Sequence, residues 1–211
     1  MKITQFCFGP FQENTYLLYD DAGNAIIIDP GNAHSQEDDE LHQFIVNHHL
    51  RPQLLLLTHA HIDHILGLNF CFQTWGLRPI MHSDEAFIYQ NASVSALMWN
   101  IDYKPGPTIS KFIEDGEKIG LGGLLLTCLL APGHSPGSIC FYHGASGQLI
   151  GGDVLFYQSI GRTDLPGGNQ TQLISSIKDI IFKLPEHTVV WPGHGPKTSV
   201  KFEKLNNPFL S

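Results

Sequence analysis

A chain of 211 residues in which 42% of the residues are hydrophobic is long enough to bury a sizeable core as one domain. Its 12 basic and 20 acidic residues give a formal net charge of −8, which disfavours binding to phosphate backbones, so we expect no nucleic-acid partner. No apolar run approaches the roughly 20 residues of a membrane span, and the N-terminal segment lacks the features of an export signal. We therefore expect one domain over residues 1–211 that is cytoplasmic and has no membrane partner.

The first half of the chain alternates strands and helices. Runs of β-branched and aromatic residues between turn residues predict strands over 2–8, 15–19, 25–29, 53–57 and 79–82. Apolar residues at helical spacing predict helices over 36–49 and 65–75 and a third that opens at 83–85. We expect Ser35 to be the N-cap of the first helix. Asp29 ends the third strand and either supports a site from behind or caps a turn, so we do not assign it as a ligand.

The second half repeats the pattern of strand and polar loop. Apolar runs predict strands over 124–131, 138–143, 148–152 and 188–191, and helical spacing predicts a helix from about 170 to 183. Neither a repeat nor a linker divides the chain. The four cysteines are scattered in apolar sequence without a Cys-x-x-Cys pattern, so we expect buried thiols rather than disulfides.

The segment Thr58-His59-Ala60-His61-Ile62-Asp63-His64 concentrates more polar groups than a core needs. Three imidazoles and one carboxylate follow directly after an apolar strand. Chance clustering explains a pair such as His48-His49 in a chain with 12 histidines, but it is a poor explanation for this spacing. Imidazole and carboxylate together suit zinc, iron or manganese. The segment therefore predicts a metal site.

Three later loops each present one more candidate ligand after an apolar strand. These are His134 in PGHSPGS, Asp153 in GGD and His194 in PGHG. Loops that follow strands of a shared direction meet at one edge of a layered sheet structure, so we expect these side chains to converge on the first segment. His82 also ends a strand, but a lone histidine there is more often a structural residue.

In this order, the segments THAHIDH, PGHSPGS, GGD and PGHG resemble the metallo-β-lactamase superfamily, and the likeness covers nearly the whole chain. The resemblance implies an α/β fold with a four-layer αβ/βα sandwich, in which two mixed sheets lie face to face with helices outside. It also implies two divalent metal ions. One is held by His59, His61 and His134, the other by Asp63, His64 and His194, with Asp153 bridging them.

This ligand set indicates a hydrolase. Two divalent ions about 3.5–4 Å apart share a water and lower its pKa, which supplies hydroxide at neutral pH, while one ion polarises a carbonyl. Asp63 and Asp153 are therefore the predicted catalytic residues, with Asp63 orienting the nucleophile. Zinc is the metal that we expect, and the ligands are also compatible with iron or manganese. No cysteine falls in these loops, which argues against a thiol enzyme.

The loop 156–169 and the segment 202–209 resemble the small bacterial glyoxalase II-like hydrolases, which cleave hydroxyacylglutathione thioesters. That resemblance predicts a small-molecule thioester substrate, hydrolysed to a 2-hydroxy acid and glutathione. Arg162 and Tyr157 are candidate substrate contacts, although an ion pair of Arg162 with Asp164 that braces the loop is the alternative. Few residues follow His194, so we expect the additional helical domain of full-length glyoxalase II to be absent.

Three other functions are compatible with these residues. A persulfide dioxygenase of the same fold would use one iron on His59, His134 and Asp153, and a lactone or ester hydrolase would use the whole ligand set. A metal-stabilised binding protein would need no turnover at all. The bridging Asp153 and the absence of an export signal argue against a true β-lactamase, and His61 argues against the flavodiiron branch, in which a glutamate is typical.

Overall fold

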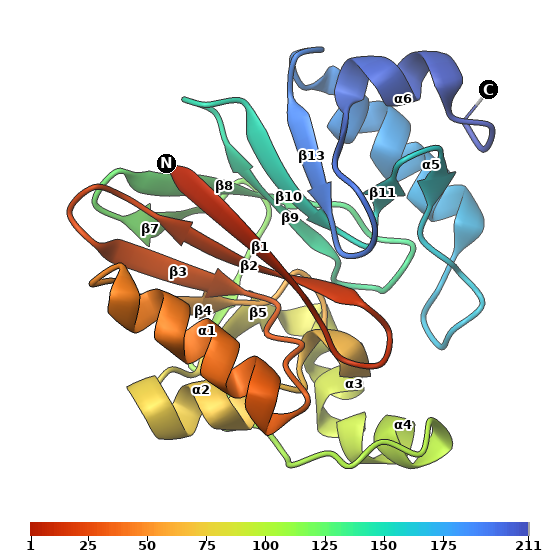
Figure 1. Ribbon diagram of the computed structural model, residues 1–211. Coiled ribbons are helices and arrows are strands. Elements are labelled where there is room, and N and C mark those ends of the chain that lie inside the picture. Colours follow the sequence, from red (N-terminus) through yellow and green to blue (C-terminus); the bar gives the residue numbers. More distant parts are fainter. Residues whose placement is uncertain (211) are drawn as a thin grey trace.

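The apolar segments form two sheets that pack face to face in the computed structural model, which describes residues 1–210 (Figure 1). The first sheet contains, in spatial order, β1 (Lys2–Phe8), β2 (Glu13–Tyr19), β3 (Asn24–Ile28), β4 (Arg51–Leu56), β5 (Pro79–His82) and β6 (Lys111–Ile113). The second contains β14 (Thr198–Ser199), β13 (Val189–Pro192), β10 (Gln148–Gly152), β9 (Ile139–His143), β8 (Leu124–Leu130) and β7 (Lys118–Leu121). A small ribbon pairs β11 (Leu155–Phe156) with β12 (Ser159–Ile160).

Both sheets are mixed, and the connections explain why. Short turns join β1, β2 and β3, which therefore pair antiparallel, whereas helical crossovers join β3, β4 and β5, which pair parallel. In the second sheet only β10 and β13 pair parallel, because a helix connects them. The helices are α1 (Ser35–Asn47), α2 (Leu68–Trp75), α3 (Ala86–Gln90), α4 (Ala92–Met98), α5 (Gln170–Asp179) and α6 (Val200–Asn206), with 3₁₀ turns η1 (Ile62–His64), η2 (Ser83–Glu85) and η3 (Ile181–Lys183).

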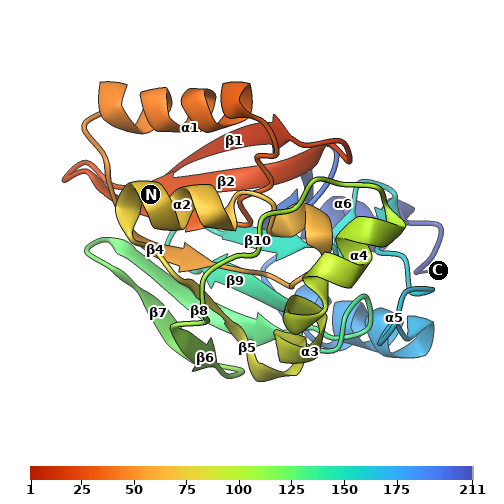
Figure 2. The ribbon, with the colours of Figure 1, turned by 90° about the horizontal axis from the view of Figure 1, so that it is seen from below.

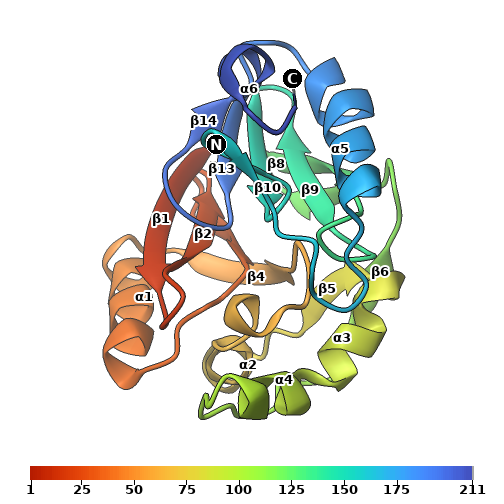
Figure 3. The ribbon, with the colours of Figure 1, turned by 90° about the vertical axis from the view of Figure 1, so that its right-hand side faces the viewer.

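Three apolar clusters separate four layers, as β3 illustrates. Ala25 and Ile27 pack in the cluster between the first sheet and helices α1, α2 and α4, while Ile26 and Ile28 pack in the cluster between the two sheets. A third cluster lies between the second sheet and helices α5 and α6. Figure 3 shows helices α1 and α2 on one side of the two sheets and helices α5 and α6 on the other. The predicted four-layer αβ/βα sandwich is thereby confirmed, and burial on both faces explains why β3 is a continuous apolar run.

Several local predictions were wrong. Residue His34, not Ser35, is the N-cap of α1, and it makes no side-chain cap bond. Instead Glu37 in the first turn accepts hydrogen bonds from the backbone N–H groups of Gly9 and Ala33. The helix expected after β5 is divided at Asn91 into α3 and α4. The short strands β6, β7, β11, β12 and β14 were not predicted, since runs of two to four residues carry little periodicity. No helix within residues 1–210 has the length and apolar composition to cross a bilayer.

Candidate metal centre

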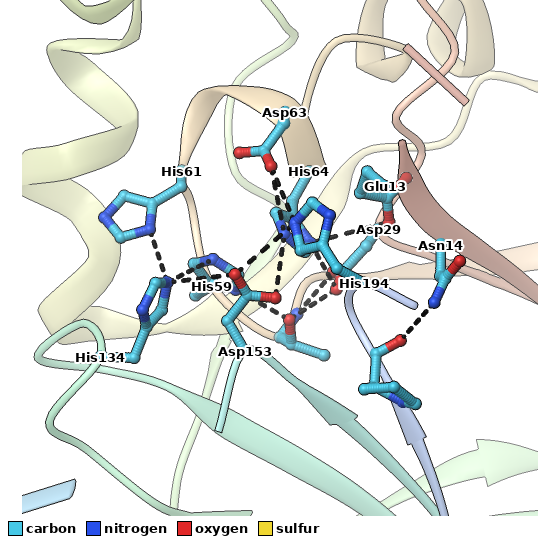
Figure 4. A network of polar contacts seen from close by, with 12 residues as sticks. Glu13, Asn14, Asp29, His59, His61, Asp63, His64, His134, Asp153 and His194 are labelled. Carbon is cyan, nitrogen blue, oxygen red and sulfur yellow. Dashed lines mark hydrogen bonds and ion pairs between the residues drawn. The ribbon is translucent and has the colours of Figure 1, made fainter. Parts of the chain in front are cut away.

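The seven predicted ligands gather at one edge of the sandwich, where loops of both sheets meet (Figure 4). The segment 58–64 follows β4 of the first sheet, and the other loops follow β8, β10 and β13 of the second. Figure 4 shows Asp153 between two groups of side chains. One group is His59, His61 and His134, and the other is Asp63, His64 and His194. In each group the candidate ligand atoms lie within 4.8 Å of one another.

In the first group, three ring nitrogens converge on one point. Nε2 of His134 lies 2.8 Å from Nδ1 of His61 and 3.2 Å from Nε2 of His59. The other nitrogen of His134 donates to the carbonyl oxygen of Arg162, and Nδ1 of His59 lies 3.0 Å from the Thr58 hydroxyl. A carbonyl only accepts, so His134 carries its proton on Nδ1 and presents a lone pair on Nε2. Ligands of a tetrahedral zinc lie about 3.3 Å apart, which is close to the spacing here.

In the second group, two ring nitrogens and one carboxylate oxygen converge in the same way. Nε2 of His194 lies 3.1 Å from Oδ2 of Asp63, and Nε2 of His64 lies 3.7 Å from the same oxygen. Nδ1 of His194 donates to the carbonyl oxygen of Phe11, and Nδ1 of His64 donates to Oδ2 of Asp29 at 3.0 Å. Each imidazole is thus held from behind and turns its other nitrogen toward the centre, an arrangement typical of histidines that bind metals.

Asp153 faces both groups. Its Oδ1 lies 3.4 Å from Nε2 of His64, and its Oδ2 lies 3.5 Å from Nε2 of His134 and 3.6 Å from Nε2 of His194. Nε2 of His64 and Oδ1 of Asp153 are buried, and neither has a hydrogen-bond partner within residues 1–210. Buried polar atoms without a partner are rare and costly. Two cations, one on each side of Asp153, would satisfy both atoms, so the residues present fit a dinuclear metal site.

Asp29, whose role the sequence left open, supports the centre from behind. It accepts hydrogen bonds from the backbone N–H and the hydroxyl of Thr58 and from His64, so both of its oxygens are occupied. Because the Thr58 hydroxyl donates to Asp29, it accepts from Nδ1–H of His59, which leaves the lone pair of His59 on Nε2. The buried Asp29 therefore orients one imidazole of each group.

A second buried carboxylate, Glu85, joins two of the ligand loops. Oε2 accepts from the backbone N–H of Ala60 at 2.8 Å, and Oε1 accepts from the backbone N–H of Gly137 at 2.7 Å. Ala60 lies between His59 and His61, and Gly137 belongs to the loop that carries His134. The spacing of Glu85 gave no signal of this role, because its contacts are to the backbone of segments distant in sequence.

The last ligand loop depends on Gly193 and on Asn14. A Cβ atom added at Gly193 would overlap Oδ1 of Asp153 and would lie 2.8 Å from Cε1 of His64. The amide of Asn14 donates to the carbonyl oxygens of Pro192 and Gly195, at 2.9 Å each, and so fixes the loop on both sides of His194. The PGHG motif predicted this loop, whereas no motif pointed to Asn14, which is far from the loop in the chain.

The neighbouring charges set the protonation of the centre in the absence of cations. Burial is the largest influence, and it lowers the pKa of His59 well below its ordinary value and the pKa of His61 to about 3. Burial raises the pKa of Asp153, but the nearby His64 outweighs it, so the pKa of this carboxyl falls well below its ordinary value. Burial lowers the pKa of His64, but the carboxylates of Asp63 and Asp153 raise it more. Neutral imidazole and ionised carboxylate are the forms that bind metal, so His64, whose raised pKa favours the imidazolium form without cations, would release a proton when a cation binds.

The two candidate substrate contacts have different positions. Arg162 lines the cavity beside the centre, but its guanidinium makes two hydrogen bonds to the carboxylate of Asp164, at 2.7 and 2.8 Å. Tyr157 is not among the residues that line this cavity, and its ring stacks on Phe202 with centroids 5.0 Å apart. Tyr157 as a substrate contact stays a prediction, and the lining of the cavity gives it no support. His82, which accepts from the backbone N–H of Asp84, also lies outside the ligand groups of residues 1–210.

Comparison with known proteins agrees with this geometry. Residues 8–194 match the model of the metallo-beta-lactamase superfamily. A probable metallo-hydrolase of Bacillus subtilis, YqgX, is 40% identical over 100% of this chain and 98% of its own length. The hydroxyacylglutathione hydrolase GloC of Haemophilus influenzae is 36% identical over 95% of this chain and 94% of its own length.

Two solved structures have nearly the same fold. BLEG-1, described as a B3 metallo-beta-lactamase, is 35% identical with a TM-score of 0.92, and each chain is covered completely. TTHA1623 in a di-iron-bound form is 36% identical with a TM-score of 0.88, covering 98% of this chain and 100% of its own. With the four-layer sandwich and the two ligand groups, these matches show that the chain belongs to the metallo-beta-lactamase superfamily.

Proposed function

We propose that the protein hydrolyses small thioesters in a reaction of the glyoxalase II type, in which an S-(2-hydroxyacyl)glutathione and water give a 2-hydroxy acid and glutathione. The observation that carries the proposal is the pair of ligand groups on either side of Asp153, with buried lone pairs that face one another. The name of the Haemophilus influenzae relative supports a thioester as the substrate.

Two divalent cations, for which we propose zinc, would polarise the thioester carbonyl and lower the pKa of a shared water toward neutrality. The chain's own residues provide rigidity and orientation. The carbonyl of Phe11 and the carboxylate of Asp29 fix the rings of His194 and His64, so little reorganisation is needed when substrate binds. Asp63 lines the cavity and is placed to orient the attacking water, which is the role we propose for it.

The metal is part of the proposal. Histidine and carboxylate ligands accept iron and manganese as well as zinc, and the di-iron form of TTHA1623 makes iron a direct alternative. Metal content should be measured on protein purified from cells grown with each metal. About two ions per chain would support the dinuclear site, whereas a single iron with oxygen uptake on glutathione persulfide would favour the dioxygenase reading.

Hydrolysis of β-lactams is the second candidate, because BLEG-1 bears that description at full coverage of this chain. The same water is able to attack an amide carbonyl, so the ligands alone do not choose between the substrates. One assay distinguishes them: metal-loaded protein is given S-lactoylglutathione, a neutral thioester, a lactone and a cephalosporin at equal concentration. Faster turnover of both thioesters supports the proposal, and faster turnover of the cephalosporin or the lactone contradicts it.

A further inference from the structure

The cavity beside the metal centre has a volume of about 610 Å³, and one of its walls is apolar. Helices α3 and α4 form this wall, and Figure 2 shows them one after the other on the side that faces the viewer. Phe87 and Ile88 of α3, with Val94 and Met98 of α4, line the cavity together with the candidate ligands His61 and Asp63. The same segment also contributes the polar residues Asn91 and Ser95 to the lining, so the wall is apolar in its larger side chains. Trp99 and Phe11 also line the cavity, and their rings meet edge to face with centroids 5.4 Å apart.

These wall residues are unusually exposed for their size. Met98 is 79% exposed, Phe87 71% and Val94 56%. Single exposed apolar residues are ordinary, but a contiguous patch that opens into a cavity marks a binding surface. Because the wall is continuous with the metal centre, a molecule whose carbonyl lies between the cations would extend directly onto it. The arrangement therefore suits an apolar group of the substrate.

The charged residues that line the cavity also favour an apolar group of the substrate. The acidic residues Asp63 and Asp153 belong to the ligand groups, and Arg162 is the one Lys or Arg among the described residues of the lining. The Nε–Nη2 edge of its guanidinium donates to Asp164 in a bidentate pair. Away from the metal centre, a carboxylate on the substrate would have to compete with Asp164 for Arg162. Glutathione carries two carboxylates, whereas an aliphatic or aromatic group carries none.

We propose that the preferred substrate is a thioester whose acyl group is uncharged and apolar, with the α3–α4 wall as the specificity determinant. This inference rests on the proposed thioester hydrolysis, and it replaces the S-(2-hydroxyacyl)glutathione named there with a thioester that carries an apolar acyl group. Met98 is the residue that tests it best, since it lies on the wall. Leu97 is its neighbour on α4, is 80% exposed, and does not line the cavity. The pair provides a variant and a control with equal exposure, the same helix and the same kind of side chain.

The experiment uses metal-loaded protein and thioesters of the neutral thiol N-acetylcysteamine, with acetyl, butyryl, hexanoyl and octanoyl groups, alongside S-lactoylglutathione. We expect kcat/KM to rise about two- to threefold for each methylene up to hexanoyl, because full burial of a methylene gives a factor of about four. The hexanoyl thioester should exceed S-lactoylglutathione in kcat/KM. Met98→Gln should lower kcat/KM for the hexanoyl thioester about three- to tenfold through KM, and should leave the acetyl thioester within about twofold. Leu97→Gln should leave every substrate unchanged.

Several results would overturn the inference, and they differ from a failure of the proposed function. A series without dependence on chain length, or equal effects of Met98→Gln and Leu97→Gln, would show that the wall does not select the substrate. If both variants abolished a dimer seen by size-exclusion chromatography and left the series intact, a second copy of the chain would be the occupant instead. If metal-loaded protein cleaved none of the thioesters, including S-lactoylglutathione, the proposed function itself would fall, and this inference with it.

Discussion

Replacement of Glu85 by Gln removes one of the two backbone contacts that tie the loop of His59 and His61 to the loop of His134. Glu85 is fully buried, and each of its oxygens accepts one N–H, from Ala60 and from Gly137. An amide side chain has a single oxygen, so one N–H would then face an NH₂ group. The substitution changes neither the volume nor the shape of the side chain, which separates this effect from packing.

The expected loss follows from the burial of these groups. A hydrogen bond to a charged group contributes about 1.5–3 kcal/mol, and a buried donor left without a partner costs about 1–3 kcal/mol. We therefore expect Glu85→Gln to lower the free energy of unfolding by about 2–3 kcal/mol. For a chain of this size that corresponds to a decrease in Tm of roughly 5–10 °C. The loops position two sides of one ligand group, so metal affinity should fall about 10- to 100-fold as well.

The measurement is thermal unfolding with and without added zinc, together with competition against a chelator of known affinity. Glu37→Gln is the matched control, because Glu37 also accepts two backbone N–H groups, from Gly9 and Ala33, neither of which belongs to a ligand loop. The control should lose stability and keep its metal affinity. A Glu85→Gln protein with the metal affinity of the wild type would refute the claim that Glu85 positions the ligands.

Four further predictions concern the centre and its surroundings. Gly193→Ala should displace Asp153 and lower metal affinity at least about tenfold, as measured by chelator competition, whereas Gly123→Ala adds a Cβ where nothing lies within 4 Å and should leave it unchanged. Asp153→Ala removes the group shared by both sites, so elemental analysis should find less than one ion per chain and no hydrolysis should be detected. Removal of both metals by a chelator should lower the Tm by about 10–20 °C, since ligand at 100 times its Kd stabilises a folded protein by about 2.7 kcal/mol per site. Hydrogen bonds from Arg162 lower the pKa of Asp164 to about 2, so this ion pair should be complete above the ordinary carboxyl pKa and lost as the pH falls through about 2. An NMR titration of the carboxyl carbon of Asp164 measures this pKa, and a midpoint near 4 would exclude the pair in solution.

The fold and the ligand loops could be predicted because their signals are local. The alternation of apolar strands with helices fixed the class, and His134, Asp153 and His194 each directly follow an apolar strand. Burial on both faces made β3 and the end of β4, at Leu55 and Leu56, apolar runs, which are easy to recognise. What the sequence could not show is how the loops are held together.

The residues that support the ligands act through contacts between distant segments. Asn14 of β2 donates to the loop of His194, and the carbonyl of Phe11 accepts from the same histidine. Neither contact depends on a motif, since a backbone carbonyl is present at every position. Tyr157 stays a prediction: it neighbours the cavity in sequence, but the turn between β11 and β12 directs its ring onto Phe202. Proximity in the chain does not predict where a side chain points in so short a ribbon.

The metal ligands and the α3–α4 wall are separate parts of the site, which explains how proteins with one fold act on different substrates. The candidate metal ligands come from loops at strand ends along one edge of the sandwich, where His59, His64 and His134 are buried and substitution is costly. The α3–α4 wall is exposed, and a change such as Met98→Gln alters its chemistry without disturbing the core. Relatives described as a hydroxyacylglutathione hydrolase and as a B3 metallo-beta-lactamase stand at nearly the same identity to this chain. Similarity of fold therefore identifies the metal-dependent chemistry, while the residues of the wall have to identify the substrate.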